Sequence, residues 1–117
     1  IAGLDSPDDA AVVRSPGPGY VSVRTVDFFR DFVGDPFVFG RIAANHALGD
    51  CHAMGAQPRT ALAIAVVPFG PPSKVEETLY QMMAGSLTSL KEAGCTLAGG
   101  HSGEGTEMAL GFSVDGE

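Results

Sequence analysis

The stretch TALAIAVV at residues 60–67 decides the fold class of this 117-residue chain. It is an apolar run of eight residues that Pro58 and Pro68 bound on either side. A run of this length, rich in β-branched residues and closed by prolines, is typical of a strand buried inside a sheet. We therefore expect residues 60–67 to form a central strand.

The segment before this strand is expected to be a helix. Residues 36–54 are rich in alanine, Asp35 is placed to cap the first turn, and Pro36 occupies the first helical position. Gly55 follows directly and is a typical residue for ending a helix.

The segment after the strand predicts a second helix. Ser73 and Glu76 have the spacing of a capping box, and apolar residues then recur at helical spacing until Gly94. The rest of the chain predicts a β-hairpin from residues 10–13 and 20–26. A short apolar piece follows at 96–98, a glycine-rich loop at 99–105 and a last strand at 108–114.

Length and composition indicate one folded domain that carries net negative charge. Hydrophobic residues make up 44% of the chain, and 14 acidic against 7 basic residues give a formal charge of −7. This balance excludes nucleic acid or an anionic membrane surface bound through counterion release, and it requires a metal ion for any phosphate ligand. The chain shows no targeting segment and no apolar run that could span a bilayer.

The two cysteines, Cys51 and Cys95, lack the spacing of a zinc site. We interpret both as reduced thiols of a cytoplasmic protein. The sequence starts at Ile1 and stops at Glu117 on what looks like an unfinished strand. We expect it to be a domain of a longer polypeptide.

The first helix places two polar residues, His46 and Asp50, where a surface helix would carry apolar ones. A carboxylate in apolar surroundings is costly unless a partner compensates it. One interpretation is an ion pair between the two side chains, one turn apart. The other is that Asp50 faces a cation or a phosphate site.

Three more aspartates stand next to the expected hairpin. Asp8 and Asp9 precede its first strand, and Asp27 follows its second, so the hairpin would bring these acids toward one edge of the sheet. Asp8 alone is typical of a turn residue. Together with Asp50, Asp9 and Asp27 could form a carboxylate site for Mg²⁺ and a phosphate substrate.

The loop GGHSGEG at residues 99–105 carries the second candidate for phosphate binding. Its glycines would let backbone amides approach a phosphate, although loops of this composition also occur as plain turns. It is neither a Walker A motif nor a dinucleotide fingerprint, because no Gly-Lys-Ser/Thr follows and a strand comes next.

Taken together, these segments resemble the N-terminal domain of selenophosphate synthetase (selenide, water dikinase), in the superfamily of aminoimidazole ribonucleotide synthetase. The matching stretches cover nearly the whole chain in order and read PDDAAVV at 7–13, TVDFF at 25–29, DPFVFGRIAANHALGD at 35–50, AMG at 53–55, TALAIAVVP at 60–68 and AGCTLAGGHS at 93–102. The elements DFF, FGRIAA and GGHS are specific to this family within the superfamily.

The resemblance implies ATP-dependent phosphorylation of selenide to selenophosphate, with AMP and orthophosphate as the other products. It implies that Asp9, Asp27 and Asp50 hold Mg²⁺, that Asp27 and Asp50 also handle the ATP phosphates, and that Gly99, Gly100, His101 and Ser102 lie along the triphosphate. The implied fold is α+β, a four-stranded mixed sheet with two helices on one face, which dimerises through the sheet into a β-barrel.

The chain also departs from the family pattern. The reactive Cys or selenocysteine and a nearby Lys would lie upstream of residue 1, and a C-terminal domain would follow, so we expect the chain alone to be inactive. His46 stands where Asn is expected, and GDCHAMGAQ at 49–57 resembles modules fused to a flavin-dependent pyridine nucleotide-disulfide oxidoreductase. The alternatives are another ATP-dependent member of the superfamily, and a non-catalytic module for dimerisation or regulation of such a fusion.

Overall fold

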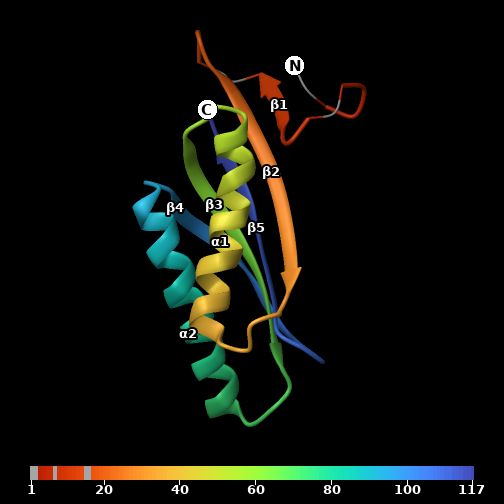
Figure 1. The fold of residues 1–117 in the computed structure, drawn as a ribbon, viewed down its shortest axis with the longest axis vertical. Helices are drawn as coiled ribbons and strands as arrows, with labels where there is room; N and C mark the ends of the chain where they lie inside the picture. The colour runs from red at the N-terminus through yellow and green to blue at the C-terminus, as the bar shows by residue number, and fades with distance from the viewer. Residues whose placement is uncertain (1–2, 7, 15–16) are drawn as a thin grey trace.

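A computed structural model describes residues 3–6, 8–14 and 17–117 of the chain. It contains two helices and five strands in an α+β arrangement (Figure 1). In chain order the elements are β1 (Ala11–Arg14), β2 (Val21–Arg30), α1 (Pro36–Ala53), β3 (Pro58–Pro68), α2 (Pro72–Glu92), β4 (Thr96–Gly105) and β5 (Ala109–Gly116).

The strands form one mixed sheet in the order β1-β2-β5-β3-β4. The β1–β2, β2–β5 and β5–β3 pairs are antiparallel, and β3 pairs parallel with β4 after the crossover through α2. The apolar run at residues 60–67 lies in β3, which has neighbours on both sides, while β5 takes the middle position. The sheet of the single chain is open, with β1 and β4 at its edges.

The expectation of four strands is wrong, because residues 99–105 form a strand and not a loop. They extend β4 to Gly105 and pair in register with β3, from Leu62 opposite Gly99 to Pro68 opposite Gly105. Glycine disfavours strands, which hid this one in the sequence. At Gly100 the glycine is required by packing, since a Cβ there would collide with the carbonyl oxygen of Ala63.

Both helices lie on the same face of the sheet, as expected (Figure 1). α1 packs on β2 and β5, and α2 packs on β3 and β4. The alternation along β3 shows that only this face is covered: Ala63 and Ala65 are buried, whereas Leu62 and Ile64 are each 50% exposed. Residues 60–67 are thus buried on one face only in the single chain. With Val26 and Phe28 of β2, Leu62 and Ile64 make the opposite face apolar, which we call the open face.

The two helices touch each other through their backbones. A Cβ on Gly40 of α1 would collide with the carbonyl oxygen of Met82, and a Cβ on Gly85 of α2 would collide with that of Phe37. The Ser86 hydroxyl donates hydrogen bonds across this contact to the Gly40 carbonyl, at 3.3 Å, and within α2 to Met82. Glycine is needed at both positions for this close approach.

The start of α1 is as expected, and the start of α2 is not. Asp35 caps α1 by accepting hydrogen bonds from the backbone N–H groups of Phe37 and Val38. α2 begins at Pro72, its N-cap residue is Pro71, and no side chain caps it. The predicted capping box is therefore wrong, because Ser73 already lies inside the first turn that the two prolines fix.

Neither helix in the described part of the chain is long and apolar enough to cross a membrane. Cys51 and Cys95 are buried free thiols, and burial is the main cause that raises the pKa of each. The absence of a disulfide between them agrees with the expectation that both are reduced.

Candidate functional site

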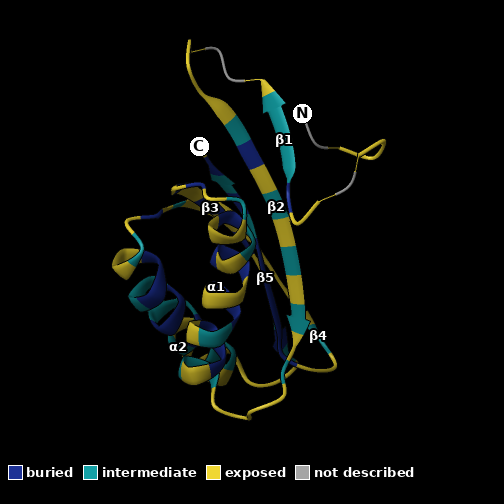
Figure 2. Cartoon of the chain, turned by 45° about the horizontal axis from the view of Figure 1, so that its top comes forward, coloured by how far each residue is buried: buried dark blue, intermediate teal, exposed yellow. Residues whose placement is uncertain are grey.

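One side of β2 faces α1 and carries two polar side chains and one aromatic side chain. Thr25, Asp27 and Phe29 are half-buried and alternate with the exposed Val26 and Phe28, an alternation visible along β2 in Figure 2. Because side chains alternate across a strand, the first three share the helix side of the sheet. The sequence placed Asp27 beyond the end of its strand, but β2 continues to Arg30, so Asp27 lies inside it.

The facing side of α1 carries His46 and Asp50, one turn apart. The Thr25 hydroxyl donates a hydrogen bond of 3.4 Å to Asp50 Oδ2. Asp50 lies close enough to Asp27 to raise the pKa of its carboxyl group, and the ring of Phe29 packs against that of His46 with centroids 5.1 Å apart. These five residues, which we call the acid cluster, hold β2 and α1 together by side-chain contacts.

The carboxyl group of Asp27 is harder to ionise than a free one. The pKa of Asp27 is raised from 3.8 to about 6, first by burial, then by the hydrogen bond to Asp50 and by the charge of Asp50. The charge of His46 acts in the opposite direction. Neighbouring carboxylate oxygens are the donors that a hard divalent ion takes, and such an ion would offset the cost of ionising Asp27.

The ion pair between His46 and Asp50 is absent from the described part of the chain, where the ion pairs join Arg24 to Asp115, Arg30 to Glu107 and Arg59 to Glu117. His46 is exposed and contacts Phe29, while Asp50 is half-buried and turned toward Thr25. The ion-pair interpretation is therefore not supported by the described residues. The other interpretation, that Asp50 faces a cation or a phosphate site, stays a prediction.

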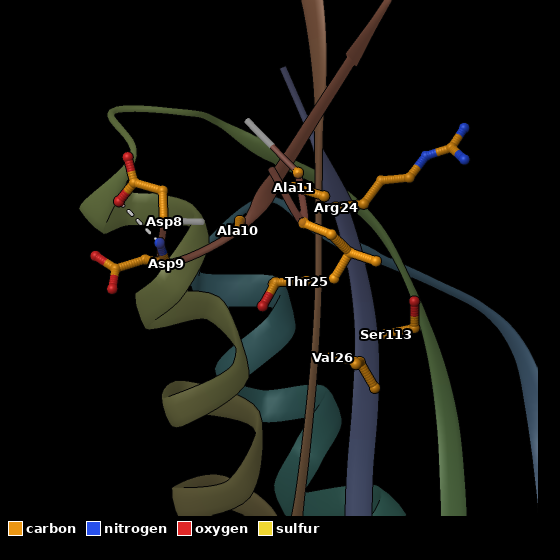
Figure 3. Close-up of a pocket in the computed structure, with 10 residues that line it drawn as sticks. Asp8, Asp9, Ala10, Ala11, Arg24, Thr25, Val26 and Ser113 are labelled. Atoms are coloured by element: carbon orange, nitrogen blue, oxygen red, sulfur yellow. Dashed lines mark hydrogen bonds between the residues drawn. The ribbon is translucent and has the colours of Figure 1, made fainter. Parts of the chain in front are cut away.

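Asp9 lies apart from the two acids of the cluster. It is exposed and lines a cavity of about 530 Å³ together with Asp8, Arg24 and Thr25 (Figure 3). Figure 3 shows the side chains of Asp8 and Asp9 pointing to one side of β2 and that of Arg24 to the other. Asp8 accepts a hydrogen bond of 2.8 Å from the Asp9 backbone N–H.

The predicted meeting of three carboxylates is not present in this chain. Among the residues that the structure describes, no three His, Cys, Asp or Glu side chains lie together in a group that could hold a metal ion. Asp9 nevertheless shares its cavity with Thr25, whose hydroxyl reaches Asp50.

The glycine-rich segment lies at the far edge of the sheet from the acid cluster. Two strands, β5 and β3, separate β2 from β4, which at the usual strand spacing is about 14 Å. Gly100 and Ser102 share the helix side with Ala63 and Ala65, and His101 pairs with Ile64 on the open face. Within one chain Asp27, Gly100 and His101 line one cavity of about 520 Å³ on the open face, but Asp50, Gly99 and Ser102 do not line it.

Sequence reasoning missed two members of the acid cluster, Thr25 and Phe29. Each lies two residues from Asp27 and therefore on the same side of the strand. This spacing of two was the sequence signal that could have identified them. It was hidden because the second strand was expected to end at residue 26.

The fold and the acid cluster define an α+β domain whose half-buried carboxylates are suited to a cation. The family model "AIR synthase related protein, N-terminal domain" matches residues 7–117, and the chain belongs to this family.

Curated relatives give a narrower comparison. The chain is 46% identical over 116 residues to the selenide, water dikinase of Nitratidesulfovibrio vulgaris strain Miyazaki F, a match that covers 99% of this chain and 32% of that protein. It is 44% identical over 116 residues to the selenide, water dikinase of Geobacter metallireducens, a match that covers 99% of this chain and 33% of that protein. The chain thus spans about a third of the length of these relatives.

Solved structures of other proteins share the fold. Thiamine monophosphate kinase from Aquifex aeolicus superposes with a TM-score of 0.78 at 19% identity, covering 97% of this chain and 39% of that one. The hydrogenase maturation protein HypE, solved in complex with ATP, superposes with a TM-score of 0.69 at 22% identity. The superposition covers 94% of this chain and 33% of HypE.

Proposed function

We propose that this chain is the ATP- and Mg²⁺-binding domain of a selenide, water dikinase. In the proposed reaction ATP, selenide and water give selenophosphate, AMP and orthophosphate. The domain supplies part of the nucleotide site, and the rest of the enzyme supplies the remainder. Support comes from membership of the family, from curated relatives with this name, and from the acid cluster.

The observation that carries the proposal is the neighbouring pair of half-buried carboxylates, Asp27 and Asp50. Such a pair stabilises a fold poorly, because the charge of Asp50 raises the cost of ionising Asp27. Such a pair is explained if a cation balances it during function. The cation would also let a chain with a net charge of −7 hold a triphosphate.

Each residue of the pair has a defined task in this proposal. Asp27 and Asp50 would hold Mg²⁺, with Asp9 as a further ligand once the nucleotide is bound. Thr25 fixes the carboxylate of Asp50 by its hydrogen bond. When bound, Mg²⁺ neutralises charge on the phosphates and orients them for in-line transfer.

A second copy of the chain would bring the glycine-rich segment to the acid cluster. Within one chain the strands β5 and β3 separate the two, and the open face leaves Leu62 and Ile64 half exposed. We therefore propose a homodimer through the open face, in which β4 of one copy lies beside β2 of the other. Residues 99–102 would then line the triphosphate.

The test is turnover by the full-length protein with ATP, Mg²⁺ and selenide, followed by phosphorus NMR for selenophosphate and by chromatography for AMP. Asp50→Asn should lower turnover by at least about a hundredfold, because positioning and charge neutralisation are most of what a protein contributes to phosphoryl transfer. Its melting temperature should stay the same or rise, since a half-buried charge is removed.

The matched control is Glu92→Gln, which removes an exposed carboxylate at the end of α2 and should leave turnover unchanged. An Asp50→Asn protein that melts earlier but turns over ATP normally would contradict the proposal. In that case Asp50 would be a structural partner of Thr25.

A further inference from the structure

His46 is a member of the acid cluster that the proposed function leaves without a task. It lies on α1 one turn before Asp50, beside Phe29, which follows Asp27 by two residues on the same side of β2. Three pairs of residues thus follow one another along the contact between β2 and α1. They are Thr25 with Asp50, Asp27 with Asp50, and Phe29 with His46. This order places the imidazole next to the pair of carboxylates.

The imidazole is oriented on one side and open on the other. Its ring meets that of Phe29 at 60° with centroids 5.1 Å apart, and yet His46 is exposed. The described residues make no ion pair with it, and its charge acts on Asp27. A side chain that is fixed by packing but keeps its nitrogens free is suited to receive a ligand.

The chemistry of the cluster indicates which ligand this would be. Carboxylates reach a phosphate only through a cation, and the Thr25 hydroxyl is already engaged with Asp50. His46 is the one nitrogen donor of the cluster, and an imidazole offers an N–H in either protonation state. A donor beside two carboxylates that hold a metal ion would meet a phosphate oxygen carried by that ion.

We propose that the His46 imidazole donates a hydrogen bond to a phosphate oxygen of the nucleotide held through Asp27 and Asp50, with Phe29 fixing the ring. This proposal rests on the proposed function, and it makes His46 a phosphate-contacting residue of this chain. Phe29 is a positioning residue that acts through His46.

The experiment measures binding of Mg²⁺ with a non-hydrolysable ATP analogue to the full-length protein by calorimetry. His46→Phe keeps a ring against Phe29 and removes both nitrogens. It should weaken binding about tenfold, the size expected for one charge-assisted hydrogen bond, while the melting temperature stays unchanged. The affinity for inorganic tripolyphosphate with Mg²⁺ should fall by the same factor in His46→Phe, since this ligand shares only the phosphates with ATP.

A double-mutant cycle tests the role of Phe29. Phe29→Leu should weaken binding in the protein that has His46 and have no further effect in His46→Phe. Additive losses would overturn the positioning role, because Phe29 would then act independently of the imidazole. If His46→Phe binds the analogue and tripolyphosphate as the unchanged protein does, the phosphate contact is refuted.

Asp50→Asn separates this proposal from the proposed function. If Asp50→Asn loses binding of the analogue and His46→Phe does not, only the role of His46 is wrong. If Asp50→Asn binds the analogue normally, the proposed function itself is wrong, whatever the result for His46.

Discussion

Replacing Asp27 by asparagine is expected to stabilise the chain near neutral pH in the absence of divalent ions. In the folded chain the pKa of Asp27 is about 6, against 3.8 for an unperturbed group. The folded state therefore holds the proton of Asp27 more tightly than the unfolded state does. Asparagine has nearly the same shape and carries no charge, so it removes the cost of ionising this group.

The size of the effect follows from the two pKa values. The difference between 3.8 and about 6 corresponds to about 3 kcal/mol if it is taken without screening. Asp27 is only half-buried, and solvent screening reduces this to about 1 kcal/mol. For a chain of this length that is a rise in melting temperature of about 4 °C.

The pH dependence has a defined sign. Because the folded pKa is raised, the unfavourable contribution of Asp27 is absent below about pH 4, develops between about pH 4 and 6, and is complete above that. Thermal melts by circular dichroism, with EDTA present, should therefore show Asp27→Asn and the unchanged chain melting alike near pH 4. They should separate as the pH rises to 7.5.

Two outcomes would refute this reasoning. A difference between the two proteins that is the same at every pH would show that the hydrogen bond of Asp27 matters and its ionisation does not. A lower melting temperature for Asp27→Asn at pH 7.5 would show that the pair of carboxylates stabilises the fold. Adding Mg²⁺ should raise the melting temperature of the unchanged chain more than that of the variant.

Three further predictions concern the helices, the open face and the isolated chain. Gly85→Ala should destabilise the fold by at least about 2 kcal/mol in chemical denaturation, because its Cβ would meet the Phe37 carbonyl, whereas Gly49→Ala has open space and should be neutral or stabilising. Light scattering should give twice the mass of one chain, and Ile64→Arg on the open face should return it to a monomer; a monomer before the substitution would contradict the dimer. The 117-residue chain alone should form no AMP from ATP and selenide, and turnover comparable to that of the full-length protein would overturn this expectation.

The parts of the fold that sequence could predict are those with strong periodicity or caps. α1 follows from Asp35, Pro36 and Gly55, and β3 follows from its apolar run, because these residues act locally. β4 could not be predicted, since its glycines have no side-chain signal and its pairing depends on the distant β3. The start of α2 was misplaced because a pair of prolines can begin a helix without a side-chain cap.

The sequence singled out the acidic residues of the cluster but not Thr25 or Phe29, and it did not predict how they are arranged. The position of Asp50 on an otherwise apolar side of α1 pointed to a site, and the structure sets it against Asp27. The hydrogen bond from Thr25, the separation of Asp9 and the distance to residues 99–102 depend on the sheet order, which no local pattern encodes. The sheet order exists only after the whole sheet has assembled.

The middle position of β5 has a consequence for synthesis of the chain on the ribosome. β5 joins β2 to β3, so residues 25–30 of β2, which lie beyond the pairing with β1, find their partners only in residues 109–114. The nascent chain can form α1, α2, the β1–β2 hairpin and the parallel β3–β4 pair, but residues 25–30 stay unpaired until β5 has left the exit tunnel. During that time the apolar side chains of β2 and β3 are exposed, and a chaperone that recognises extended apolar segments would find its target there.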